Sequence, residues 1–292
     1  MIDGLISIAL SGLILGSLYS LIASGMSLIW STLGAFNFAH GALMASGAYF
    51  VYTFAVEPLA LPLWIAVPIG LVLGAAFGLL VERILFRPFI SGPDGAMTVM
   101  VVTLVATSII QNAIQLIWGP KLKQLPTLTD LRVPIGDAVL QGNQLVAIIL
   151  APLLIGLIAL LLARTRVGSI VRAVEQNREL SLLMGIKPAY VYAGVVAVAA
   201  VLATVAGVLL GGIQFMTPTM GADLMIRGFM ILVFGGAASL KGTLIGAYVI
   251  GLIEAASGYF FGLFWSPVIL IGLIFVIMLV RPEGLIKVGA RR

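Results

Sequence analysis

The stretch "GLISIALSGLILGSLYSLIASGMSLIWSTLGAFNFAHGALMASGAYFVYTFAV", residues 4–56, contains no Asp, Glu, Lys or Arg. It is too long for one membrane-spanning helix, which needs about 20 apolar residues. Two spans fit it, with a break near "WSTLGAFNFAHG", residues 30–41. Because no basic region precedes the first apolar run and no small-residue cleavage site follows it, we expect a retained helix and not a signal peptide.

The composition extends this prediction to the whole chain. Of the 292 residues, 61% are hydrophobic and 9% are charged, and the mean hydropathy is +1.20. A soluble domain carries about 25% charged residues, so this chain lacks the residues for a hydrated surface. Long apolar runs without alternation favour helices over a barrel. The sequence predicts an all-α, polytopic transmembrane bundle.

Nine segments are long enough to cross a bilayer, and eight or ten remain possible if one segment is re-entrant. They belong to a single transmembrane domain, residues 1–292. The expected spans are 5–30, 38–56, 62–82, 97–118, 139–163, 189–213, 222–238, 243–262 and 264–281.

The basic residues predict the orientation of these nine spans. If nine consecutive spans cross the membrane, the only basic residues on one side of it are Lys121, Lys123 and Arg132. The positive-inside rule makes the other side cytoplasmic, with the N-terminus outside and the C-terminus inside. The net charge of +5 therefore indicates topology and does not require nucleic acid. The cytoplasmic set is Arg83, Arg87, Arg164, Arg166, Arg172, Arg178, Lys187, Lys241, Arg281, Lys287, Arg291 and Arg292.

One charged stretch interrupts the apolar sequence: "RAVEQNRELSLLMGIKPA", residues 172–189. It predicts a short helix over 169–184 that ends at Gly185, before Pro188. On such a helix Arg172, Glu175 and Glu179 share one face. From physics alone this segment is an amphipathic helix at the lipid headgroups or a docking element for a cytoplasmic protein, and the first is the commoner case.

Catalytic chemistry has little support in the sequence. There is no cysteine, no HExxH motif, no metal-ligand cluster and no GxxxxGK[ST] phosphate loop. Glu175 and Glu179 have no nucleophile near them in sequence. We therefore expect no enzyme, no catalytic residue and no metal site in this chain.

Polar residues inside the apolar segments are candidates for a translocation pathway. Asn37, His40 and Gly41 interrupt one helical pattern, and Thr217 and Pro218 interrupt another. Such breaks can direct backbone groups at a cavity, as in the discontinuous helices of transporters. The alternative, which we rank first for Asn37 and His40, is that they cap a helix end. An external loop is equally compatible with Thr217 and Pro218.

Lone charges and glycines complete the pattern. Glu254 lies in an apolar span and is expected near the outer interface, while Asp223 and Arg227 can pair at i, i+4. Gly70, Gly74 and Gly78 form a doubled GxxxG motif, for which packing inside the bundle is favoured over a subunit interface. "ASGAYFVYTFAVE" (45–57) and "LIGAYVIGLIE" (244–254) share a short echo, which is too short to prove an internal repeat.

Four motifs together resemble a known family. "LGAFNFAHGALMASGAY" (33–49), "RAVEQNRELSLLMGIKP" (172–188), "VFGGAASLKGTLIGAYVIGLIE" (233–254) and "LVRPEGL" (279–285) occur in the order found in branched-chain amino acid permeases of ATP-binding-cassette importers. The first motif is more similar to the LivH branch than to the LivM branch.

This resemblance implies a function and partners. It implies a permease with inverted-repeat character in a bacterial-type cytoplasmic membrane, surrounded by lipid. It also implies a second homologous permease, two cytoplasmic ATPases that bind ATP-Mg, and an external solute-binding protein. Within the cytoplasmic loop 164–188 it implies that the ATPases are contacted by Arg172, Glu175, Arg178, Glu179, Leu183 and Gly185.

The substrate implied is a branched-chain or related small amino acid. The alternative is a secondary transporter driven by an ion gradient. That class usually needs carboxylates inside the membrane, and only Asp223 and Glu254 are available here.

Overall fold

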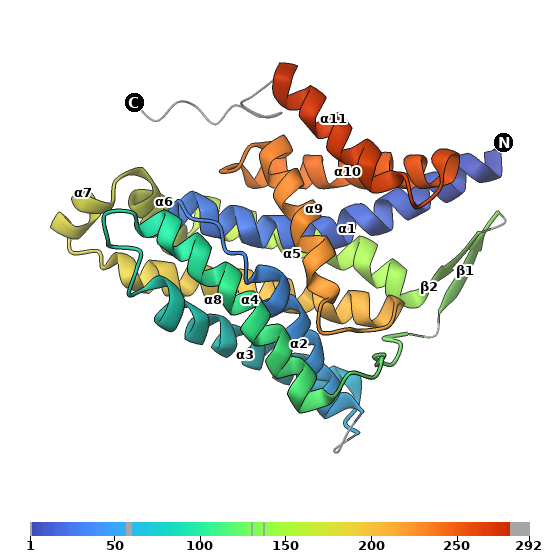
Figure 1. The fold of residues 1–292 in the computed structure, drawn as a ribbon, viewed down its shortest axis with the longest axis horizontal. Coiled ribbons are helices and arrows are strands. Elements are labelled where there is room, and N and C mark those ends of the chain that lie inside the picture. The colour runs from blue at the N-terminus through green and yellow to red at the C-terminus, as the bar shows by residue number, and fades with distance from the viewer. Residues whose placement is uncertain (1, 57–59, 130, 137, 281–292) are drawn as a thin grey trace.

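The fold is a bundle of long antiparallel helices (Figure 1). It is seen in a computed structural model that describes residues 2–56, 60–129, 131–136 and 138–280. The basic tail and part of the motif at 279–285 lie outside these residues. The elements are α1 (Ile2–Leu33), α2 (His40–Ala55), α3 (Leu63–Val81), the π-helical turn η1 (Glu82–Phe86), α4 (Gly95–Trp118), β1 (Arg132–Ile135), β2 (Ala138–Gln141), α5 (Gly142–Arg164), α6 (Arg166–Gln176), α7 (Arg178–Leu183), α8 (Pro188–Ile213), α9 (Met220–Gly235), α10 (Leu240–Phe261) and α11 (Ser266–Val280).

All nine expected spans are helices, but they differ in length. Among the described residues, six are long and apolar enough to cross a membrane alone: α1, α3 with η1, α4, α5, α8 and α10. The helices α2 and α9 have only 16 residues each, and α11 has 15. The chain is a multi-pass membrane protein in which α2 and α9 cover only part of the bilayer thickness.

Two halves of the chain repeat one architecture in opposite orientation. The helices α1 and α8 lie side by side and antiparallel, and α2 and α9 cross them steeply (Figure 1). The helix α1 packs on α9 and α10 as α8 packs on α2 and α3. Thus α1, α2 and α3 correspond to α8, α9 and α10. The sequence echo, which matches residues of α2 with residues of α10, aligns helices that are not equivalent.

The two halves meet where α2 and α9 begin. A Cβ atom on Gly41 would overlap the carbonyl oxygen of Gly221, and a Cβ atom on Gly221 would overlap that of Gly41. The contact is reciprocal, as expected at a pseudo-twofold axis. Only glycine allows two backbones to approach this closely.

The glycines of α3 face helices of the same chain. A Cβ atom on Gly70 would meet Val51 of α2, and one on Gly74 would meet Thr204 of α8. Gly78 lies against Ala200, one turn before Thr204. This glycine face therefore packs α3 onto α2 and α8.

The segment 119–138, between α4 and α5, ends in a hairpin. Strands β1 and β2 pair antiparallel, with Arg132 opposite Gln141. The preceding part of the segment pairs through Lys123 with Met216, between α8 and α9. Hairpin pairing satisfies backbone groups locally, so α5 starts at Gly142 and not at 139.

Candidate coupling and translocation sites

The charged stretch forms two helices where one was predicted over 169–184. The helix α6 ends at Gln176, and α7 begins at Arg178. Between them Asn177 has an extended backbone, and its side chain accepts a hydrogen bond from the Leu180 N–H. Asparagine is a preferred N-cap, which explains why a second helix starts here. Gly185 has φ +80°, a conformation that suits the predicted helix-ending glycine.

Because of this break, Glu179 lies on a different helix from Arg172 and Glu175, and these two residues of α6 have different surroundings. Glu175 is half-buried and accepts hydrogen bonds from the hydroxyls of Ser31 (2.6 Å) and Thr32 (3.3 Å), at the end of α1. Arg172 is exposed and donates to the Leu162 carbonyl at the end of α5. Glu175 therefore joins α6 to α1, a partner that no sequence pattern indicated.

The second helix carries the exposed part of the segment. Arg178 donates to the Ser91 hydroxyl at 2.8 Å, while Glu179 and Gly185 are exposed. Leu183 and Met184, at the end of α7, are 84% and 79% exposed. This tip lies at the end of the bundle where α1 ends (Figure 1). An apolar tip bordered by charges has the form of a protein-docking element.

The first candidate pathway cluster is buried. Asn37 is 2% exposed and its Oδ1 accepts from the Ala39 N–H. His40 is fully buried, with its ring against Gly25 of α1. In this conformation these residues, with Gly41, lie in packed protein at the start of α2.

The second candidate cluster lies elsewhere. Thr217 and Pro218 are half-buried and follow Met216, which pairs with Lys123 of the segment between α4 and α5. The two helix starts meet at Gly41 and Gly221, and Gly41 also lies against Met225. The structure therefore brings the two interrupted helices together without joining their polar loops into one cavity.

An ion pair inside the bundle was missed by sequence reasoning. Arg227 of α9 pairs with Glu254 of α10 at 2.9 Å, and the Tyr19 hydroxyl of α1 donates to Glu254 at 2.6 Å. The Glu254 side chain is only 11% exposed. Leu252, two residues before Glu254, packs on Gly12 in the N-terminal half of α1, and the expected position of Glu254 toward the outer interface stays a prediction. Lone opposite charges in two apolar spans were the available signal, since such charges usually pair.

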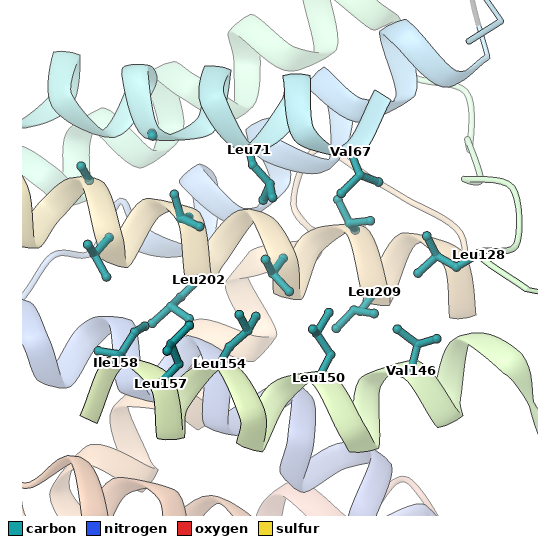
Figure 2. Close-up of a pocket in the computed structure, with 16 residues that line it drawn as sticks. Val67, Leu71, Leu128, Val146, Leu150, Leu154, Leu157, Ile158, Leu202 and Leu209 are labelled. Atoms are coloured by element: carbon teal, nitrogen blue, oxygen red, sulfur yellow. The ribbon is translucent and has the colours of Figure 1, made fainter. Parts of the chain in front are cut away.

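The surface between α3, α5 and α8 has a different character. A cavity of about 540 Å³ opens there, and every side chain that lines it is apolar. Figure 2 shows Leu71, Leu150 and Leu154 among these aliphatic groups. A lining without a hydrogen-bonding side chain suits acyl chains and offers nothing to orient a polar solute.

Comparisons with known proteins agree on one family. The profile described as "Branched-chain amino acid transport system / permease component" matches residues 8–279. The chain is 30% identical to the high-affinity branched-chain amino acid transport system permease protein BraD of Pseudomonas aeruginosa, over 94% of each chain. It is 28% identical to LivH of Escherichia coli, over 94% of this chain and 93% of that one. A solved structure, PsaBC from Streptococcus pneumoniae in complex with Fab, has a similar fold: the TM-score is 0.52, the identity 12%, and the coverage 97% of this chain and 95% of that one.

Proposed function

The chain belongs to the family of permease components of branched-chain amino acid transport systems, and we propose that it is the membrane subunit through which an ATP-binding-cassette importer carries branched-chain or related small amino acids. The observation that carries the proposal is the family match over residues 8–279, which includes all the long helices. The partners proposed are a second homologous permease, two cytoplasmic ATPases that bind ATP-Mg, and an external solute-binding protein.

We further propose that the α6–α7 segment is the ATPase-contacting element. Its exposed tip at Leu183 and Met184 supports this assignment, as do the exposed charges of Arg172, Arg178 and Glu179. The N-terminus is then outside and α6 and α7 are cytoplasmic, in agreement with the basic residues of 164–188. Glu175 acts differently from the others: it passes movement of α6 to the end of α1 through Ser31.

A pair of leucine substitutions tests this function. In proteoliposomes that hold the complete complex, Leu183→Asp is expected to abolish ATP-driven leucine uptake, because a carboxylate at the apolar tip opposes ATPase docking. The matched control is Leu263→Asp, since Leu263 is 86% exposed and lies beyond α10, next to the first turns of α1. The control is expected to keep both uptake and co-purification of the ATPase subunits.

Two outcomes would contradict the proposal. One is uptake by Leu183→Asp equal to that of the control. The other is leucine accumulation by this chain alone under an ion gradient, which would favour the secondary transporter.

A further inference from the structure

One face of α9 carries two charges close to the middle of α1. Asp223 and Arg227 are separated by one turn, and Asp223 is exposed. Arg227 packs near the ring of Tyr19, in the middle of α1, and Gly221 contacts Gly41 in the interior of the bundle. An ionised side chain at this depth faces a water-filled cavity or a polar partner and not lipid. This face of α9 is therefore on the side of the pathway.

The geometry of Arg227 leaves part of its guanidinium available. Its Nε donates to both carboxylate oxygens of Glu254 (2.9 and 3.1 Å), and Nη2 lies 2.9 Å from Oε1. Nη1 takes no part in this pair, and the side chain is 23% exposed. Glu254, itself held by the Tyr19 hydroxyl, fixes the orientation of the guanidinium. A fixed guanidinium with a free donor edge is suited to bind a carboxylate.

Asp223 supplies the complementary charge. Among the described residues, its carboxylate has no hydrogen-bond donor, because Arg227 is directed to Glu254. Residues four apart on a helix have Cβ atoms about 5–6 Å apart, which two adjacent charged groups of a small ligand can bridge. Ile226, 50% exposed, and Met230 lie on the same helix face.

We propose that this face of α9 binds the solute directly: Asp223 holds the ammonium group of an α-amino acid, Nη1 of Arg227 holds its carboxylate, and Ile226 and Met230 contact an aliphatic side chain. The inference rests on the proposed function and assigns the substrate contacts within it. Glu254 and Tyr19 are positioning residues that act through Arg227.

Equilibrium binding, measured without the solute-binding protein, reports on this site alone and not on the delivery of solute. The test measures binding of radiolabelled L-leucine to the detergent-solubilised complex of this chain with its permease and ATPase partners, without the binding protein. Competitors are 4-methylpentanoate, which lacks the ammonium group, and 3-methylbutylamine, which lacks the carboxylate. Loss of one charge-assisted hydrogen bond predicts that Asp223→Asn weakens leucine binding by about tenfold or more.

The analogues make the assignment specific. In Asp223→Asn, 4-methylpentanoate is expected to compete as well as unlabelled leucine, whereas it competes poorly in the wild type. The matched control is Asp3→Asn, because Asp3 also lies in the first turn of a helix, α1, but far from this face. A first-turn carboxylate stabilises a helix through the helix dipole. The Asp3→Asn variant shows whether loss of such a carboxylate by itself changes leucine binding.

A second variant guards against loss of folding at Arg227. The double substitution Arg227→Gln with Glu254→Gln leaves no unpaired charge and is expected to lose leucine binding while still assembling with the ATPases.

Three results would overturn the inference: wild-type affinity in Asp223→Asn, wild-type affinity in the double variant, or loss of binding in Ser11→Leu alone. Ser11 lines, together with Glu254, a cavity of about 440 Å³ between α1, α5 and α10, so the last result would place the solute in that cavity and not on the face of α9. If the wild-type complex neither binds nor transports any amino acid, the proposed function itself fails, which is a distinct outcome.

Discussion

The two inverted halves of the bundle solve the same packing problem with different chemistry. In space, the first half consists of α2 and α3 packed on α8, and the second of α9 and α10 packed on α1. In the first half, Gly47 of α2 and Gly74 of α3 both lie against Thr204 of α8. In the second half, the equivalent helices α9, α10 and α1 meet through Arg227, Glu254 and Tyr19. Gly47 and Arg227 each lie seven residues after the first residue of their helices, His40 and Met220.

This difference separates a rigid half from a half that can exchange partners. Glycine contacts are held by close packing and cannot shift without overlap. An ion pair can transfer a hydrogen bond to a ligand and keep its charge satisfied. The comparison therefore agrees with the solute contacts proposed for α9.

The largest expected effect is at the junction of the halves. Gly221→Leu should prevent folding, because the added side chain overlaps the Gly41 carbonyl and cores tolerate little added volume. The measurement is the yield of monodisperse protein in detergent. Gly194→Leu is the control, since a Cβ atom there meets nothing within 4 Å. Equal yields for the two variants would mean that the halves do not depend on this contact.

Breaking the ion pair ranks second. Glu254→Gln leaves the guanidinium of Arg227 without its counter-charge, which destabilises a buried site by roughly 3–5 kcal/mol. We expect about 3 kcal/mol, near the lower end of that range, because the Arg227 side chain is 23% exposed. Thermal unfolding in detergent should show the loss, and adding Arg227→Gln should restore most of it. A single variant as stable as the wild type would remove the basis of the comparison.

Removing the tyrosine hydroxyl should have a smaller effect. Tyr19→Phe deletes the 2.6 Å hydrogen bond to Glu254, and a hydrogen bond to a charged group contributes about 1.5–3 kcal/mol. The same unfolding measurement applies. Tyr259→Phe serves as control, because Tyr259 is 57% exposed. If the two variants unfold alike, Tyr19 does not support the pair.

The smallest effect is expected in the glycine-packed half. Thr204→Ala removes a methyl group and a hydroxyl that bonds only to the Ala200 carbonyl of its own helix. A buried methyl group contributes about 1 kcal/mol. A loss in Thr204→Ala larger than that in Glu254→Gln would reverse the ranking of the two halves.

Much of the fold could be predicted from the sequence, because a long run of apolar residues directly predicts a helix that crosses the membrane. Every apolar segment is a helix, and Gly185 has the conformation expected of a helix-ending glycine. Helix length was less predictable. The segments of α2 and α9 contain as few charges as full spans, and only the contact of Gly41 with Gly221 shows that they begin inside the bundle.

The candidate sites were less predictable because they depend on distant partners. Glu175 was expected on an exposed face, but it bonds to Ser31, which is 144 positions away in sequence. The capping role of Asn177 is local and could have been foreseen from its residue type. The sequence allowed Arg227 to pair with Asp223 on its own helix, yet it pairs with Glu254, because tertiary packing places a better-buried carboxylate beside it.

Helix α1 is hydrogen-bonded to two carboxylates that lie on two other helices. Its Ser31 and Tyr19 donate hydroxyl hydrogen bonds to Glu175 of α6 and Glu254 of α10. These residues are twelve positions apart, or about 18 Å at the rise of an α-helix. Since helical hydrogen bonds hold that rise nearly constant, axial sliding of α1 changes both carboxylate environments together. With the ATPase contact and the solute site proposed above, one movement of α1 would then act on both sites.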